Sequence, residues 1–440
     1  MSQSGVRIDA ALAEAKSAHE SGDLKQAGRM YRKVLSQDPK CAPALNLYGI
    51  LASQRGDNAS AIKRITQAIA IDGSVVDYHI NLAVVQETAG DLNAAFDRYA
   101  AALAIEPRNP ELLGRLSPIA QSTGRYEDFV STLSSLCAAM PDYAEAFYLR
   151  GLSLNILRRM DEAADSLRKA VTLAPGFTQG YANLASVLMD SGKPAEALAA
   201  CNDCLLLDPA ETFALATKAI ALAEQGDYEK LRPLMDFDTL LDVHTLDLPP
   251  GYDSIEIFNA ALRDAVLTHP SLRLDPNHRS CHFATQTDDL FLDPAEPFVA
   301  FETMIREAAN DYRRKLDRNA AHPFLANPMP ETALVGWATV MRAQGHQSAH
   351  IHPTSWLSGV YYVTVPDLVR RGDNAHKGWI EFGRPPEHYP ITVDPDVTFL
   401  EPVEGKLILF PSYLYHRTVP YEDDAMRISI AFDFDTTLAS

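Results

Sequence analysis

The sequence predicts an α+β protein of more than one domain, in which an all-α repeat is followed by an all-β jelly roll with flanking helices. Three observations predict this fold class. Small and turn-forming residues recur every 34 positions in the first half, a Pro-Pro-Gly break follows at residues 249–251, and short β-branched and aromatic runs then replace the helical pattern. At 440 residues the chain is also too long for one ordinary core.

Composition and charge describe a folded protein and exclude two classes of partner. Apolar residues make up 47% of the chain and charged residues 22%, which is typical of soluble globular proteins. We expect a cytoplasmic protein, because the sequence has neither a run of about 18 apolar residues that would cross a membrane nor the features of a secretory signal. The formal net charge of −19 argues against nucleic acid and anionic membrane surfaces as partners.

Three series of residues at a spacing of 34 define the repeat. Glycine at each predicted turn supports a backbone that other residues resist. Small residues in the first helix of each pair let the second helix approach closely, and proline ends the second helix. Arg158 breaks the glycine series. The series are Gly22, Gly56, Gly90, Gly124, Gly192 and Gly226; Ala15, Gly49, Ala83, Ser117, Gly151, Ala185 and Ala219; and Pro39, Pro107, Pro141, Pro175 and Pro209, with Gly73 in the gap.

The second helices of the repeat have a predicted buried stripe, in which an alanine is followed four residues later by a larger residue. Cys201 belongs to this stripe, so we interpret the CxxC sequence from Cys201 to Cys204 as packing and not as a metal or redox site. The five cysteines are scattered and odd in number, which fits reduced thiols better than a disulfide framework.

This pattern resembles the tetratricopeptide repeat over roughly residues 7 to 232. The resemblance implies stacked helical hairpins in a superhelix whose concave face holds a peptide or protein segment. An alternative is that the repeats only dimerise or stiffen the chain. We assign residues 7–235 to the repeat domain and residues 236–264, which contain the Pro-Pro-Gly break, to a junction.

Residues 265–440 are the predicted jelly-roll domain. Helices are expected around residues 254–268, across the boundary with the junction, and around 297–318. Strands are expected at 333–342, 356–365, 378–383, 405–410 and 427–434, where β-branched and aromatic runs are separated by Gly, Pro and Asp. A two-sheet jelly roll of the cupin kind is the simplest arrangement of such strands.

Histidines stand at the ends of two of these strands. His350 and His352 precede one strand, and their spacing places both side chains on one face of an extended chain, where they can share a metal. His416 follows another strand, and Arg427 and Ser429 come shortly after it. Imidazoles are suitable ligands for Fe(II), and three of them leave coordination positions free for a bidentate keto-acid and for O2. A guanidinium offers planar, two-pronged donors to a carboxylate, and a serine can add a hydroxyl.

The segments HIHPTSWLSGVYYVTVP, LILFPSYLYH and RISIAFDF occur in this order, and with them the chain resembles bacterial 2-oxoglutarate/Fe(II) oxygenase domains over about residues 265–435. The resemblance implies a double-stranded β-helix with Fe(II) at its open end, and a reaction with O2 in which decarboxylation of 2-oxoglutarate accompanies hydroxylation of a substrate. By position, it makes His350 and His416 metal ligands and Arg427 the residue that binds the keto-acid. Either Tyr361 or Tyr362, of which strand alternation turns only one inward, assists.

The third metal ligand is left open by the sequence. Most members of this superfamily have Asp or Glu two residues after the first histidine, where this chain has His352. Three possibilities compete: His352 completes a three-histidine site, two histidines bind the metal together with water, or an acid from elsewhere, such as Glu381, enters.

The remaining residues are interpreted more simply. Trp356, Leu357 and Val360 are expected to pack in the barrel, and His346, His376 and His388 to be solvated or hydrogen-bonded; Gln286, Thr287 and Arg342 are candidates to face the pocket. The leading hypothesis is a 2-oxoglutarate-dependent hydroxylase whose repeats recruit a peptide or protein. The alternatives are a three-histidine dioxygenase that needs no keto-acid and a non-catalytic adaptor with an inactive barrel.

Overall fold

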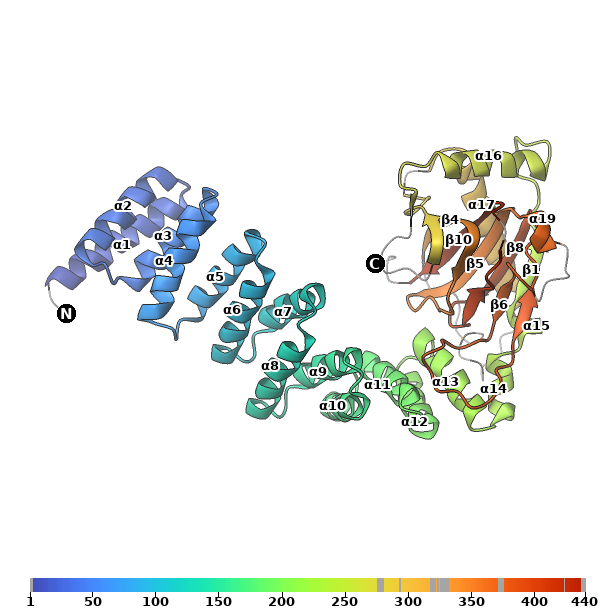
Figure 1. Cartoon of the computed structure of the whole chain (residues 1–440), viewed down its shortest axis with the longest axis horizontal. Helices are drawn as coiled ribbons and strands as arrows, with labels where there is room; N and C mark the ends of the chain where they lie inside the picture. Colours follow the sequence, from blue (N-terminus) through green and yellow to red (C-terminus); the bar gives the residue numbers. More distant parts are fainter. Residues whose placement is uncertain are drawn as a thin grey trace. The chain divides into compact units, whose positions relative to one another are not determined.

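The computed structural model describes residues 3–274, 281–292, 294–316, 322, 324, 332–370, 376–422 and 424–436. The chain divides into two compact units, Met1–Ala174 and Pro175–Ser440. Helical hairpins make up the first unit and the beginning of the second, and antiparallel β-sheets follow (Figure 1). The predicted fold class is therefore confirmed.

The first unit consists of helices that pack as successive antiparallel pairs. They are α1 (Gln3–Glu20), α2 (Leu24–Gln37), α3 (Ala42–Gln54), α4 (Asn58–Ile71), α5 (Val76–Thr88), α6 (Leu92–Ile105), α7 (Pro110–Thr123), α8 (Tyr126–Ala139), α9 (Ala144–Ile156) and α10 (Met160–Leu173).

The 34-residue series have the roles that their spacing predicts. The glycines of the turn series have φ angles between 66° and 82°, a left-handed conformation that glycine adopts without strain. Arg158, which breaks the series, has φ 58° and so adopts the same conformation. Gly151 lies against the second helix of its pair, because a Cβ atom there would come within 2.6 Å of Leu167 Cγ. Cys201 and Cys204 are fully buried, as the packing interpretation requires.

The second unit begins with further helices and continues into the sheets. Its helices are α11 (Thr178–Asp190), α12 (Pro194–Leu207), α13 (Thr212–Glu224), α14 (Tyr228–Leu234), α15 (Phe237–Leu240), α16 (Ile255–Leu267), α17 (Phe298–Lys315) and α19 (Asp367–Arg370). Helices α16 and α17 lie where the sequence predicts two helices, and Ser254 caps the first of them by accepting a hydrogen bond from the backbone of Ile257.

Two antiparallel sheets form the β part of the unit. The larger has the order β1-β8-β5-β10-β4-β3-β2 and the smaller the order β7-β6-β9. The strands are β1 (Asp242–Thr245), β2 (Arg273–Leu274), β3 (Cys281–Gln286), β4 (Ala333–Gln347), β5 (Ser355–Thr364), β6 (Ile380–Phe382), β7 (Thr398–Leu400), β8 (Lys406–Pro411), β9 (His416–Thr418) and β10 (Arg427–Asp435).

Side chains from the two sheets meet in the interior. The Phe382 ring of β6 lies 4.9 Å from the Phe410 ring of β8, measured between centroids. Helices α16 and α17 cover the opposite face of the larger sheet (Figure 1), where Phe301 of α17 contacts Tyr361 and Phe432. The β part is thus a two-sheet sandwich with helices on one side, the arrangement expected of a jelly roll.

The last repeat helices pack directly on the β part within the second unit. The Thr212 hydroxyl at the start of α13 donates a hydrogen bond to the Pro353 carbonyl at 2.6 Å. At the other end of α13, the Glu224 carboxylate accepts hydrogen bonds from the backbone of Thr392 and Val393. The helices α11 to α14 therefore share a compact unit with the sheets, and among the described helices none is long and apolar enough to span a membrane.

Candidate metal centre

Three histidines come together where the two sheets adjoin. His350 and His352 follow β4, and His416 begins β9. The backbones of His350 and His416 form an isolated antiparallel bridge with two N–H to carbonyl hydrogen bonds of 3.1 Å. The His352 N–H donates to the Ser412 carbonyl, also at 3.1 Å. Backbone pairing therefore fixes all three positions before any metal is considered.

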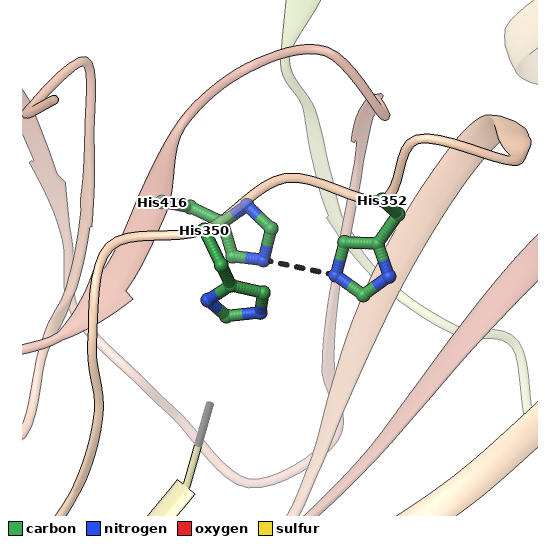
Figure 2. A group of neighbouring side chains, drawn as sticks. All are labelled: His350, His352 and His416. Atoms are coloured by element: carbon green, nitrogen blue, oxygen red, sulfur yellow. Dashed lines mark hydrogen bonds between the residues drawn. The ribbon is translucent and has the colours of Figure 1, made fainter. Parts of the chain in front are cut away.

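The three imidazole rings face one another (Figure 2). One nitrogen from each ring lies within 4.8 Å of a nitrogen from the other two. The Nε2 atoms of His352 and His416 are 3.3 Å apart, and the His350 and His416 ring centroids are 4.3 Å apart. These positions allow three nitrogens to bind one ion, which is one of the three possibilities that the sequence leaves open.

Each ring is oriented through its other nitrogen. Nδ1 of His350 lies 2.7 Å from the Ser348 carbonyl, Nδ1 of His416 lies 3.0 Å from the Leu414 carbonyl, and Nδ1 of His352 lies 2.6 Å from Asp433 Oδ2. These acceptors assign the Nδ1–H tautomer to each ring, which leaves the Nε2 lone pairs for a metal.

Burial keeps two of the rings neutral. His416 is 6% exposed, and burial, followed by the neighbouring His350 and His352, lowers its pKa well below the ordinary value. Burial, followed by the neighbouring His352, lowers the pKa of His350 to about 4. Neutral imidazole is the form that binds metals, so these two ligands need not release a proton near neutral pH.

Asp433 connects the centre to the larger sheet. Its second oxygen, Oδ1, accepts a 2.6 Å hydrogen bond from the Ser358 hydroxyl, which in turn lies 2.8 Å from the Ser412 hydroxyl. Sequence reasoning did not single out Asp433. Its position six residues after Arg427, and therefore on the same face of a regular strand, was the available signal.

Arg427 is a buried cation without a carboxylate partner among the described residues. It is 2% exposed, its Nε has no hydrogen-bond partner, and one of its terminal nitrogens lies 3.3 Å from Met341 Sδ. Its guanidinium carbon lies 5.2 Å from the centroid of the Tyr362 ring. The Tyr362 hydroxyl is also buried and makes no geometric hydrogen bond within the described part of the chain. Burial raises the pKa of Tyr362, and the charge and hydrogen-bonding capacity of the Arg427 guanidinium oppose that rise.

Strand alternation separates the two tyrosines, as the sequence predicts. Tyr362 points to the same side as Arg427. Tyr361 points to the helices, where its hydroxyl donates a 2.7 Å hydrogen bond to Asn259 Oδ1 and its ring packs on Phe301. The expected role beside the keto-acid therefore passes to Tyr362, because Tyr361 lies on the opposite face of the sheet.

Other candidates occupy different places. Ser429 is buried and pairs in register with Tyr362 and with Thr339, whose hydroxyl accepts a 3.0 Å hydrogen bond from the Gln286 amide. The Thr287 hydroxyl accepts a hydrogen bond from the Ala338 backbone, and Arg342 is exposed.

Glu381 does not reach the histidines. Its carboxylate is fully buried and is held between the guanidinium groups of Arg384, at 2.5 Å, and Arg417. Because Phe382, the next residue of β6, contacts the His416 ring, alternation turns Glu381 to the other face of the smaller sheet. The possibility that Glu381 supplies the third ligand is therefore wrong.

The histidines that were expected to lie outside the site do so. His346 stacks on His282, His376 stacks on Phe399, and His388 lies 3.7 Å from Asp190. Within the part of the chain that the structure describes, the metal-ligating cluster consists of residues 350, 352 and 416.

Residues 336–433 match the family described as "Putative 2OG-Fe(II) oxygenase", and tetratricopeptide repeat families match residues 12–74, 49–110, 88–152, 144–177 and 178–211. In this chain, matches to tetratricopeptide repeats are thus followed by a match to the putative 2OG-Fe(II) oxygenase family. The oxygenase match contains the three histidines, Arg427 and Asp433, so the geometric centre and the family match fall on the same residues.

Relatives among known proteins cover only part of the chain. It is 25% identical to protein FlbA of Caulobacter vibrioides over 49% of this chain and 37% of FlbA, and 23% identical to the human protein O-mannosyl-transferase TMTC3 over 50% of this chain and 26% of that protein. The chain thus spans well under two thirds of these relatives. Among solved structures, Naa15/Naa10 bound to HypK-THB gives a TM-score of 0.42 at 14% identity over 53% of this chain and 36% of that one. At this TM-score the likeness carries no argument about function.

Proposed function

We propose that the chain is an Fe(II)- and 2-oxoglutarate-dependent oxygenase that hydroxylates a peptide or protein. Arg427, which is buried and has no carboxylate partner among the described residues, supports this proposal most strongly. A buried cation without a counter-charge is unfavourable, and a dicarboxylate cosubstrate supplies the missing charge. Arg427 also lies on the β10 face that presents Asp433 to His352, so the cation and the metal centre open into the same interior.

The three histidines fit a ferrous ion. Their Nδ1 atoms are already tied to acceptors, and three imidazole ligands leave further positions for a bidentate keto-acid and for O2. When bound, Fe(II) supplies the chemistry by which O2 oxidises a substrate C–H bond while 2-oxoglutarate is decarboxylated to succinate.

The chain's own residues bind and orient the cosubstrate. The Arg427 guanidinium forms charge-assisted hydrogen bonds to the distal carboxylate of 2-oxoglutarate. Two hydroxyl groups are the neutral donors of this subsite. One is that of Tyr362, beside the guanidinium, and the other is that of Ser429, which pairs with Tyr362 across the two strands. Asp433 holds the His352 ring in place through its hydrogen bond to Nδ1.

The repeats provide the argument for a polypeptide substrate. Helix α13 begins beside the metal centre, because the Thr212 hydroxyl binds the carbonyl of Pro353, the residue after His352. A segment bound along the last repeats is therefore delivered to the histidines, and tetratricopeptide repeats commonly bind such segments.

Succinate formation tests the proposal. The protein is reconstituted anaerobically with Fe(II), and succinate is measured after O2 is added with and without 2-oxoglutarate. We expect succinate only when Fe(II) and 2-oxoglutarate are both present. Arg427→Met should weaken binding of N-oxalylglycine, a 2-oxoglutarate mimic, by about 100-fold, roughly 3 kcal/mol, and leave Mn(II) affinity unchanged.

Two outcomes would favour the alternatives. Oxygen consumption that needs Fe(II) but no keto-acid indicates a three-histidine dioxygenase. Absence of bound iron or manganese after reconstitution indicates a non-catalytic adaptor, in which the repeats alone have a role.

A further inference from the structure

A hollow lies in front of the histidine cluster. It has a volume of about 1010 Å³, part of which is open solvent, and its wall includes His350, His352 and Trp337. Three carboxylates line it, those of Asp288, Asp289 and Asp433, and its described lining contains no lysine or arginine. A substrate that reaches the metal through this hollow meets a wall of negative charge.

Asp289 is built into this wall in a fixed orientation. Its Oδ1 accepts hydrogen bonds of 3.0 Å from the backbone N–H groups of Phe291 and Gly336. Its Oδ2 has no partner among the described residues, so one carboxylate oxygen stays available while the other anchors the group. The other two carboxylates differ, because Asp433 is occupied by His352 and Ser358. Asp288, 55% exposed, lies 3.7 Å from Arg273.

Trp337 joins Asp289 to the metal centre. It follows Gly336, whose N–H binds Asp289, and its ring stacks on the His352 imidazole with a centroid separation of 5.7 Å and an interplanar angle of 22°. The Asp289 carboxylate, the Trp337 indole and the His352 imidazole thus line the same hollow. A carboxylate next to an indole is a favourable site for an ammonium or guanidinium group, which gains from the charge and from the face of the ring.

We propose that this hollow binds a cationic side chain, of the lysine or arginine type, from the polypeptide substrate. Asp289 is the counter-charge and Trp337 the wall along which the aliphatic carbons lie. This inference rests on the proposed function, because it takes the three histidines as the metal centre. The net charge of −19 acts in the same direction, since it attracts basic segments and repels acidic ones.

Small-molecule probes test the proposal on the full chain loaded with Mn(II). The unpaired electrons of Mn(II) shorten the relaxation times of protons in a probe that binds nearby. The probes are Nα-acetyl-lysine N-methylamide, the corresponding arginine compound, and the uncharged Nα-acetyl-norleucine N-methylamide. We expect saturable relaxation of the methylene protons of both cationic probes, and binding about tenfold tighter than that of the norleucine probe.

The variant Asp289→Asn isolates the charge. The asparagine keeps a carbonyl oxygen for the two backbone N–H groups, so the local fold should remain, while the tenfold preference for the cationic probes should disappear. The matched control is Asp264→Asn on α16, which removes one exposed carboxylate of the same type and should leave the preference intact.

The outcomes separate this inference from the proposed function. Equal binding of charged and uncharged probes to Mn(II)-loaded protein, or a preference that survives in Asp289→Asn, overturns the inference and leaves the metal centre untouched. Calorimetric titration of metal-free protein with the same probes is the second measurement. A preference for the cationic probes there, in a chain that binds no Mn(II), supports the cation site and refutes the oxygenase proposal.

Discussion

Asp433→Asn is the most informative substitution in the metal centre. The wild-type carboxylate accepts the His352 Nδ1–H at 2.6 Å and the Ser358 hydroxyl at 2.6 Å. Asparagine preserves size and one carbonyl oxygen but removes the charge that polarises His352. It can also turn its NH2 group toward Nδ1, which places the ring proton on Nε2 and blocks the nitrogen that faces His416.

The expected loss follows from these two effects. Removing the outer partner of a metal-binding histidine weakens metal affinity by about 10- to 100-fold, which is about 1.4 to 2.8 kcal/mol. The lower value describes a ring that keeps its orientation with a weaker acceptor. The upper value describes a ring whose Nε2 is protonated, so that two histidines remain.

Mn(II) affinity is measured by electron paramagnetic resonance of the free ion, and thermal unfolding establishes that the variant is folded. Asp435→Asn is the matched control: it removes a carboxylate from the same strand, where Asp435 accepts a hydrogen bond from the Thr354 hydroxyl. This control should change Mn(II) affinity by less than about twofold. Adding Asp433→Asn to His352→Ala should have no further effect, because Asp433 acts through His352.

One result would refute the reasoning. If Asp433→Asn binds Mn(II) as tightly as the wild type, while His416→Ala abolishes binding, then His352 is not a ligand. The centre would then consist of His350 and His416 with water.

Three further predictions concern other parts of the chain. Tyr361→Phe should lower the free energy of unfolding by about 1 to 2 kcal/mol, because the acceptor of its hydroxyl on α16 stays buried and loses its donor. In calorimetric titrations, Tyr361→Phe should leave N-oxalylglycine affinity unchanged, whereas Tyr362→Phe should weaken it. Gly151→Ala should destabilise the repeats by about 1 to 3 kcal/mol in urea unfolding, since the new methyl group meets a leucine of α10. Burial raises the pKa of the Cys204 thiol to about 12 and that of Cys201 as well. In the folded protein both thiols should therefore resist alkylation by iodoacetamide at pH 8.5, as measured by mass spectrometry. The stability that they contribute should be lost as the pH rises from about 9 toward 12, because the thiols of the unfolded chain ionise at lower pH than those of the folded protein.

Periodicity made the helical part predictable from the sequence. A residue that recurs every 34 positions has the same neighbours each time, so the turn glycines and the small residues between helices could be assigned without coordinates. Arg158 shows the limit of this inference, because its φ of 58° reveals that the turn persists where the glycine does not.

The histidine cluster was predictable for a different reason: His350, His352 and His416 lie at strand ends, and their order along the chain is informative. The strands β1, β2, β3, β7 and β9 were missed; none is longer than six residues, and such lengths give little alternation to recognise. The selection of Tyr362 over Tyr361 needed the register of β5 against β10, which is set by long-range pairing.

The partners of the site were much harder to predict from the sequence. Asp433 contacts a histidine 81 positions away, and Asp289 is fixed by the backbone of Gly336. An aspartate on a strand or in a loop is ordinarily a solvated residue, and only the fold brings these two to the centre. The same is true of Glu381, whose two arginine neighbours exclude it from metal binding.

The hydrogen bond from Thr212 to Pro353 has a consequence for any attempt to exchange modules. The final hairpins support the loop that holds His352, so they belong structurally with the β-sheets although their sequence is that of tetratricopeptide repeats. A chimera with foreign repeats should therefore be joined near Pro175. A junction at residue 235 would remove the helices that support the loop with His352. A loss of activity could then come from a disturbed site or from lost substrate binding, and the two causes could not be told apart.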